Sequence, residues 1–385
     1  MKTLAFLFAA ALAAAAAEPI APWSSGVTVR PLIPNAGRHL IHAYFNISPE
    51  SPDGRWVVYY SSPQREGYQG EVRILERATG KEIVLARNVT TEDAHRAACQ
   101  QWVSRGERVV FHDLRSGEWV VATVEVASGK ERVLARDRLV AWGSAIHDFV
   151  PIYGKHWAPG KHRDLELLNV VTGEIRKVVT ADQVKLAYPE LIAKEFGERP
   201  ISIFFPILSP DASRVFFKIA TPTGGDYRST QASHREQIYA YDLAKSRFLF
   251  GDGRWGHPAW HPDSRTLINS PNMLWDSNTS KARPIPDLPV FRGSHPSISP
   301  DGELFVTDYT TAVKGQWAVA VAEIAGTRHR ELHRFDNSKG ANSWRVSHPH
   351  PVFSADGRRV YFNVNDGPWT RLMVAEAGST QTSRR

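Results

Sequence analysis

The feature that most constrains the fold of this chain is a short phrase that recurs along it. The phrase is a small residue, then Pro-Asp-Gly or a close variant, then a run of β-branched and aromatic residues. Proline presets a turn, aspartate can hydrogen-bond back to the backbone, and glycine accepts positive φ, so each copy predicts a tight turn between two strands. Five strong copies and two weaker ones are centred on Asp53, Arg105, Gly160, Asp211, Asp263, Asp301 and Asp356.

The spacing of these copies, roughly 50 residues in most cases, indicates a repeat protein. Most copies are followed by a second hairpin around Thr-Gly or Ser-Gly, as at residues 79–80, 128–129 and 172–173. Four short strands per unit, seven times over, predict an all-β fold, a seven-bladed β-propeller with four-stranded blades. Residues 18–378 should then form one domain, although the length alone would allow two or three.

The ends of the repeat predict how the ring closes. The seventh unit offers only three strands before Gly378, and the unassigned segment 27–33 has strand character. We therefore expect this N-terminal strand to complete the last blade and hide its edge. One helix is expected near residues 188–196, and residues 379–385 are expected to form a flexible tail.

The first 17 residues are typical of a secretory signal peptide. Lys2 precedes an apolar run over residues 4–17 that ends in three alanines before Glu18. An uncleaved anchor is the alternative, but the run is short for a membrane span. The sequence thus predicts a periplasmic or secreted protein, with no membrane contact after cleavage.

The composition of the chain limits the classes of partner and the kinds of site that we expect. The chain has 47 basic and 40 acidic residues, a formal charge of +7, which suits a polyanion: nucleic acid, an anionic membrane or an acidic saccharide. With an export signal and no nucleic-acid motif, an acidic saccharide is favoured over nucleic acid. Cys99 is the only cysteine, which excludes an intrachain disulfide and a zinc site built from paired cysteines. The absence of G-x-S-x-G excludes the serine hydrolase that accompanies some propellers.

Histidines recur at one register of the last three units. Six positions before the turn aspartate stand His257, His295 and His350, each followed by proline, and His348 lies two positions before His350. The first strand of a blade lines the central channel, so we expect these four side chains to meet at one mouth of it. Neutral imidazole is the commonest metal ligand. The alternative is that His-Pro merely starts a strand and was copied with the repeat.

Arginines cluster near the same register. Arg292 stands three residues before His295, Arg345 stands three before His348, and Arg235 precedes a strand of the fourth unit. A planar guanidinium binds carboxylates in a bidentate manner, so these are candidate substrate-binding residues. The alternative is ordinary solvated surface charge.

The motif W-R-V-S-H-P-H-P-V-F-S-A-D-G at residues 344–357, with G-S-H-P at 293–296 and W-G-H-P at 255–258, resembles the oligogalacturonate lyases, the family-22 polysaccharide lyases. The repeats resemble the broader TolB-like and WD40-like propellers. The lyase resemblance implies cleavage of acidic pectic oligosaccharides by β-elimination. It also implies a divalent metal, Mn²⁺ first and Zn²⁺ or Ni²⁺ as alternatives, held by three histidines and a glutamine.

Carried over by position, the resemblance makes His295, His348 and His350 metal ligands and His257 the catalytic base. The glutamine of the family falls at Arg345, which cannot ligate a metal, so we expect either one protein ligand fewer or a changed use of the site. One hypothesis is that Arg345 takes over part of the electrostatic role of the metal. The competing functional interpretation is a non-catalytic TolB-like periplasmic propeller that binds protein or saccharide.

Overall fold

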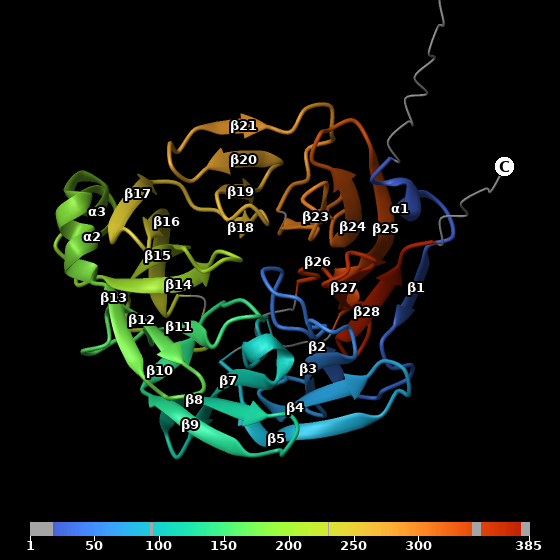
Figure 1. Ribbon diagram of the computed structural model, residues 1–385, viewed down its shortest axis with the longest axis horizontal. Helices are drawn as coiled ribbons and strands as arrows, with labels where there is room; N and C mark the ends of the chain where they lie inside the picture. The colour runs from blue at the N-terminus through green and yellow to red at the C-terminus, as the bar shows by residue number, and fades with distance from the viewer. Residues whose placement is uncertain (1–17, 93–94, 230, 294, 341–347, 379–385) are drawn as a thin grey trace, which may run out of the picture.

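A computed structural model describes residues 18–92, 95–229, 231–293, 295–340 and 348–378. Within them the chain forms seven four-stranded antiparallel sheets arranged as a ring around a central channel, with β2, β18 and β26 towards the middle and β5, β9 and β21 at the rim (Figure 1). The predicted seven-bladed propeller is confirmed. Residues 1–17 and 379–385, for which a signal peptide and a tail are predicted, lie outside the described residues.

The first four blades each use four consecutive strands. Blade one contains β2 (His39–Ile41), β3 (Trp56–Ser62), β4 (Gln69–Glu76) and β5 (Glu82–Thr90). Blade two contains β6 (Gln101–Val103), β7 (Arg108–Arg115), β8 (Glu118–Glu125) and β9 (Glu131–Arg136). Blade three contains β10 (Arg138–Val140), β11 (Phe149–Gly154), β12 (Leu165–Asn169) and β13 (Ile175–Val179). Blade four contains β14 (Ser202–Leu208), β15 (Arg214–Pro222), β16 (Ser233–Asp242) and β17 (Arg247–Asp252).

The last three blades follow the same order until the ring closes. Blade five contains β18 (Ala259–Trp260), β19 (Thr266–Asn269), β20 (Met273–Asp276) and β21 (Ala282–Pro284). Blade six contains β22 (Ser297–Ile298), β23 (Leu304–Thr310), β24 (Gln316–Glu323) and β25 (His329–Asp336). Blade seven contains β26 (Val352–Phe353), β27 (Arg359–Val364), β28 (Arg371–Glu376) and the N-terminal β1 (Thr28–Pro31). The short helices are α1 (Ala21–Ser24), η1 (Ser104–Gly106), α2 (Ala181–Ala187), α3 (Pro189–Phe196) and η2 (Asn337–Lys339).

Six of the seven copies of the recurring phrase make the predicted turn between the first two strands of a blade, whereas the weak copy at Gly160 lies between β11 and β12. In the first copy Ser51 Oγ donates to Asp53 Oδ1 at 2.5 Å, and the backbone N–H of Trp56 donates to Ser51 Oγ at 2.9 Å, while Gly54 has φ of 71°. Because serine and aspartate satisfy the turn internally, the strand that follows starts at a fixed register. The same serine–aspartate hydrogen bond occurs in three further copies, at residues 209 and 211, 299 and 301, and 354 and 356.

The insert between blades three and four holds the longest helices. The predicted helix near residues 188–196 is present as α3, and α2 precedes it. Thr180 and Gln183 form a capping box at the start of α2, which explains why that helix begins there. Ile192 and Phe196 bury the inner face of α3 against blade four. Within the described residues, no helix is both long and apolar enough to cross a membrane.

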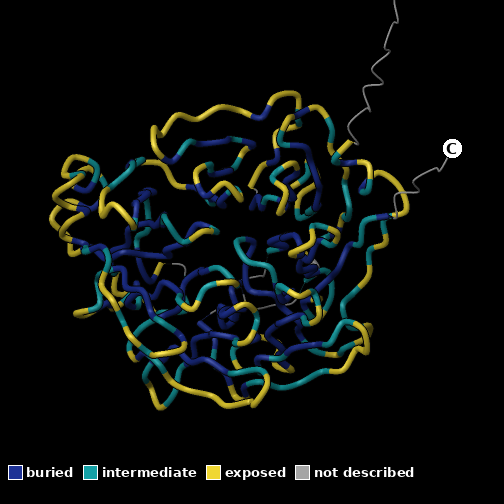
Figure 2. The backbone as a smooth tube through the Cα atoms, in the orientation of Figure 1, coloured by how far each residue is buried: buried dark blue, intermediate teal, exposed yellow. Residues whose placement is uncertain are grey.

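Burial follows the strands of each blade, and exposure is concentrated on the outer strands and turns (Figure 2). The predicted closure of the ring is confirmed, since β1 pairs antiparallel with β28, with Thr28 opposite Glu376 and Arg30 opposite Val374. A buried ion pair adds to this closure. The carboxylate of Glu50, from blade one, accepts from Arg359 of blade seven at 2.8 Å and from the hydroxyl of Tyr361, and it raises the pKa of Arg359.

We expect Glu50→Ala to lower the free energy of unfolding by about 3 kcal/mol, because it removes the buried acceptor of Arg359 and Tyr361 and leaves Arg359 only the half-exposed Asp356 as a counter-charge. Urea unfolding followed by circular dichroism measures this change. Glu376→Ala is the matched control, since it removes an exposed partner of Arg30 on the same closing blade and should cost less than about 1 kcal/mol. Equal losses in the two variants would contradict a role for Glu50 in closing the ring.

A second stability prediction concerns His112, which is fully buried in β7. Burial first, and then the nearby Arg96, lower the pKa of His112 to about 3. The unfolded chain binds a proton here below about pH 6.5, whereas the folded chain does not until about pH 3, so stability is lost as the pH falls through this window. The loss attributable to this residue is about 1.4 kcal/mol per pH unit.

Urea unfolding of wild type and His112→Leu at pH 6.5, 5.5 and 4.5 tests this prediction. The variant should show a shallower decline of stability with falling pH, by about one proton. Because the comparison uses slopes, a constant cost of altered packing cancels. Parallel declines in the two proteins would contradict it.

Candidate active site

The three repeated histidines stand at the start of the innermost strands. His257, His295 and His350 lie just before β18, β22 and β26, which are only two residues long, so they sit on the loops that lead into these strands. Side chains of β19 in blade five and β23 in blade six accept hydrogen bonds from their backbone N–H groups. Asn269 accepts from the N–H of His257 at 3.0 Å, and Asp308 accepts from the N–H groups of His295 at 2.7 Å and His350 at 3.1 Å.

The structure brings the four predicted histidines together. The ring centroids of His295 and His350 are 4.7 Å apart, those of His295 and His348 are 5.2 Å apart, and that of His257 lies 4.7 Å from His295. Strand periodicity is not the reason for His348 and His350, because residues 348–350 are not in a strand and His350 has φ of 46°. In this irregular segment the two rings lie in the same cluster, with centroids 5.7 Å apart.

A fifth histidine, His95, joins this cluster from the connection between blades one and two. Its ring centroid lies 4.4 Å from those of both His348 and His350. One ligand atom from each of these three residues lies within 4.8 Å of the others, so they form a candidate metal centre. This set shares two members with the predicted ligands, and His95 stands beside His295. Sequence reasoning missed His95 because it lies outside the repeated register, and no spacing signal marks it.

The ring of His295 has a hydrogen-bond partner of its own, Asp308. Its Nδ1 lies 3.0 Å from Asp308 Oδ1, and the Asp308 side chain is fully buried. A carboxylate only accepts hydrogen bonds, so Nδ1 of His295 is the donor to Asp308. Asp308 therefore orients His295 and anchors the backbone of His350 in the next blade.

The electrostatics of the cluster fit a metal. Both ring nitrogens of His350 are buried and have no hydrogen-bond partner among the described residues. Burial first, and then the nearby His95, His295 and His348, hold the pKa of His350 well below its ordinary value. The imidazole is therefore neutral, which is the form that ligates metals, and a set of such nitrogens suits a first-row divalent ion.

Two aromatic residues after β2 pack beneath the cluster. Tyr44 stacks on Trp142 at 5.2 Å and lies 4.5 Å from His350, measured between ring centroids, and Phe45 lies 5.3 Å from His295. Both are nearly inaccessible to solvent. They keep water away from that side of the histidines, so charges there interact strongly.

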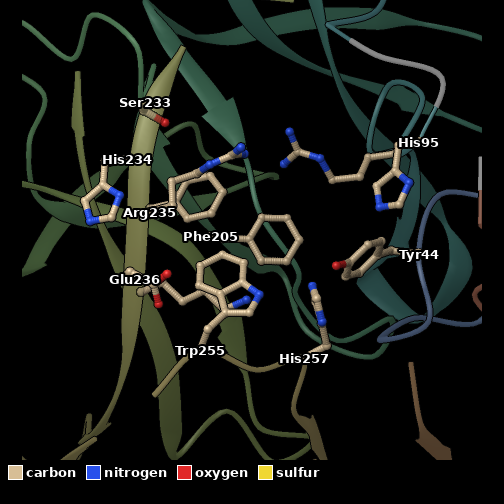
Figure 3. A pocket seen from close by; sticks show the side chains of 12 residues that line it. Tyr44, His95, Phe205, Ser233, His234, Arg235, Glu236, Trp255 and His257 are labelled. Atoms are coloured by element: carbon tan, nitrogen blue, oxygen red, sulfur yellow. The ribbon is translucent and has the colours of Figure 1, made fainter. Parts of the chain in front are cut away.

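A cavity of about 360 Å³ opens beside the cluster (Figure 3). His95, Tyr44 and His257 form one side of it, and Arg235 and Glu236 of β16 lie on the opposite side. Of the predicted residues, His257 and Arg235 thus line the cavity. Arg292 is exposed on the connection before β22 and does not contribute to its lining. Arg345 lies outside the described residues.

Comparison with solved structures shows that other proteins share the fold of this chain. A structure of an oligogalacturonate lyase in complex with manganese superposes with a TM-score of 0.65 at 16% identity, covering 93% of this chain and 95% of that one. The oligogalacturonate lyase of Vibrio parahaemolyticus gives 0.62 at 14% identity, covering 92% and 94%. The chain shares the fold of these lyases.

A TolB from Acinetobacter baumannii also matches, with a TM-score of 0.42 at 14% identity, covering 85% of this chain and 82% of that one. No family model matches the chain, and no curated protein matches it.

Proposed function

We propose that the protein is a metal-dependent polysaccharide lyase that cleaves oligogalacturonate, or a related uronic-acid oligosaccharide, by β-elimination. The observation that carries the proposal is the set of His95, His348 and His350, two of them buried, near His257 and a cavity with basic side chains. The shared fold supports it, because one of the lyases of that fold is a manganese complex. We name Mn²⁺ first for this reason, and imidazole donors also suit Zn²⁺ and Ni²⁺.

The reaction breaks a C–O bond after loss of a proton from C5 of the uronate. That proton is weakly acidic because the adjacent carboxylate is negative, and a bound divalent metal supplies the neutralising charge. His257 accepts the C5 proton on a ring nitrogen. The C–H electron pair becomes the C4–C5 double bond, and the C4 oxygen leaves with its bonding pair and takes a proton from solvent.

The residues of this chain have distinct roles in that scheme. His95, His348 and His350 would hold the metal, and the ring of His295, oriented by Asp308, packs beside those of His348 and His350. Tyr44 and Phe45 exclude water from beneath the site. Among the predicted carboxylate-binding arginines, Arg235 lines the cavity and is proposed to bind substrate.

The direct test is to incubate the purified protein with oligogalacturonate and follow the ultraviolet absorbance of the 4,5-unsaturated product, with metal analysis of the same sample. A lyase should contain a divalent metal, form the product and lose activity on treatment with a chelator. A protein with no metal and no product from a panel of uronic-acid oligomers would favour a non-catalytic propeller that binds protein or saccharide.

The cellular location is part of the proposal. An acidic oligosaccharide meets this protein in the periplasm or outside the cell if the first 17 residues direct export. N-terminal sequencing of the protein from the producing cell should find Glu18 first. An intact Met1 in the mature protein would contradict cleavage.

Asp308→Asn should weaken the affinity for Mn²⁺ about 10- to 100-fold, because the amide no longer fixes the proton of His295 or both backbone N–H groups. Titration calorimetry of the metal-free protein measures this without turnover. Asp366→Asn, which changes a partly exposed carboxylate of blade seven, is the control and should bind Mn²⁺ like wild type. Unchanged affinity in a folded Asp308→Asn variant would contradict the positioning role.

A further inference from the structure

The central channel holds a second cavity, of about 380 Å³, at the mouth opposite the histidines. The repeated histidines precede the innermost strands, whereas this cavity is lined by the ends of those strands and the turns after them, for example by Trp260, Ile298 and Phe353. All seven blades contribute to its wall. Among the described residues, none lines both this cavity and the one beside the histidine cluster. The two cavities are therefore separate compartments.

A layer of aromatic side chains divides the channel between the two cavities. Phe45 lines the second cavity, and its ring centroid lies 4.5 Å from that of Tyr44, which lines the first. The ring of Tyr44 also lies 5.2 Å from that of Trp142 and 5.1 Å from that of Phe205. A ligand in the second cavity is thus separated from the histidines by this layer.

The lining of the second cavity is uncharged and mainly apolar. Among the described residues that form it, none is acidic, basic or a histidine, and most are aliphatic, aromatic or proline. The indole N–H of Trp102 donates to the carbonyl of Pro49 at 2.7 Å, and that of Trp260 donates to the carbonyl of Ile207 at 3.0 Å. These donors are already used, so the two rings present only apolar surface. Water in such a cavity finds few partners, and an apolar ligand gains affinity by displacing it.

Two hydroxyl groups are available in this apolar lining. Ser144 of blade three and Ser297 of blade six both line the cavity, and neither hydroxyl has a hydrogen-bond partner among the described residues. Blades three and six lie on opposite sides of the ring (Figure 1). A serine hydroxyl can donate or accept a hydrogen bond, so each can pair with a hydroxyl or amino group of a ligand.

The recurring turns surround the opening of the cavity. Pro262, Pro300 and Ala355 belong to these turns, are exposed, and also line the cavity. A volume of about 380 Å³ falls within the range of small-molecule sites. Because walls from all seven blades enclose the space around the ring, it fits a compact small molecule better than an extended peptide.

We propose that this second cavity binds a neutral aromatic molecule that carries one hydroxyl or amino group, as a phenol or an aryl amine does. The ring of the ligand packs against the aromatic wall, and its polar group hydrogen-bonds to Ser144 or Ser297. A charged ligand is disfavoured, because an ion buried without a counter-charge loses its hydration. The inference goes beyond the proposed function, since it involves neither the histidines nor a uronate.

Fluorescence titration of the purified protein with N-phenyl-α-naphthylamine tests the proposal. This probe is a neutral aryl amine with a single N–H, and its emission rises in apolar surroundings. The matched probe is anilinonaphthalene sulfonate, which has the same rings and an added negative charge. The protein should bind one molecule of the neutral probe per chain, and it should bind the sulfonate at least about tenfold more weakly.

Two variants locate the bound probe. Ala145→Trp fills part of the cavity from a partly exposed position, and Ile47→Glu places a carboxylate on its wall. Each should weaken binding of the neutral probe about tenfold or more. The controls are Trp255→Ala, which alters the other cavity, and Leu186→Glu, which removes an exposed apolar side chain of α2. Both controls should bind the probe like wild type, and thermal melting checks that every variant is folded.

A gentler variant keeps the test decisive if the first two do not fold. The double variant Ser144→Ala, Ser297→Ala removes only two hydroxyl groups from the wall of the cavity. It should weaken binding of N-phenyl-α-naphthylamine about 3- to 10-fold, because the amine loses its hydrogen-bond partner. Wild-type affinity in this variant would show that the hydroxyls do not bind the ligand.

Three other results would overturn the site. They are the absence of saturable binding, equal affinity for the two probes, and wild-type affinity in a folded Ala145→Trp or Ile47→Glu variant. A loss in Trp255→Ala as large as that in Ala145→Trp would place the probe in the cavity beside the histidines and would also reject the proposal. Neither metal nor turnover enters these measurements, so the lyase proposal is judged separately by product formation.

Discussion

Replacing His350 with alanine should remove the bound metal and lower turnover of oligogalacturonate by about a thousandfold or more, while the propeller stays folded. A metal at the substrate carboxylate would stabilise the developing charge by several kcal/mol. Because about 1.4 kcal/mol corresponds to a factor of ten in rate, loss of the metal should slow turnover to this extent. His350 is central to the candidate metal centre, because its ring lies against those of His95, His295 and His348. Metal analysis and the ultraviolet assay on the same preparation measure both effects.

Two further variants make this result interpretable. His348→Ala alters a less buried member of the same centre and should give the same loss with less effect on folding. His329→Ala, an exposed histidine of β25, should retain metal and activity. A His350→Ala protein that melts earlier but keeps its metal would show that the histidine only packs against Tyr44 and its neighbours. That outcome would favour the alternative that His-Pro only starts a strand and was copied with the repeat.

His257→Gln should lower kcat by a factor of about 100 to 10,000 without loss of metal, because proton abstraction by a positioned base contributes that much. Glutamine keeps the approximate length and polarity of the side chain but cannot take the proton. The ring of His257 borders the cavity and lies 4.7 Å from that of His295, which places it beside the metal ligands rather than among the three that the geometry groups. Steady-state kinetics with metal analysis separates the two roles.

Two other results for His257→Gln would contradict its role as the base. If His257→Gln loses metal in step with activity, the residue is a ligand and another group removes the proton. If it keeps both metal and turnover, the proton goes elsewhere and His257 serves only to line the cavity. A matched control is His261→Gln, because His261 lies in the turn of blade five, where it contacts Asp263 and the backbone of Gly302. This variant should leave kcat unchanged.

Much of the fold was predictable because its information is local and repeated. The serine–aspartate turn is satisfied by its own residues, so each of the four copies that contain it starts a strand in the same way wherever it stands in the ring. Counting copies predicted seven blades, although the copy at Gly160 follows the second strand of its blade instead of the first. A strand left over at the N-terminus was enough to predict the closure that β1 makes with β28. The helix α2 was missed, although the pair Thr180 and Gln183 is a recognisable capping box.

The candidate site was predictable only to the extent that it belongs to the repeat. His257, His295 and His350 share a register with the turn aspartates, and the structure brings them to one mouth of the channel together with His348. His95 carries no such mark, because it comes from a connection between blades whose path depends on the surrounding blades. The pairing of Asp308 with His295 could not be predicted either, because it depends on how two segments of blade six pack together, which the sequence of neither segment shows.

The sequence by itself thus determined the number of blades, the way the ring closes and one register of histidines, because turns and strand patterns depend on neighbours along the chain. Tertiary structure alone decided which three imidazoles come within ligand distance, and it placed Arg235 of blade four on the cavity that His95 and His257 also line. These arrangements depend on contacts between residues far apart in the chain. Such contacts exist only after the blades have closed into a ring.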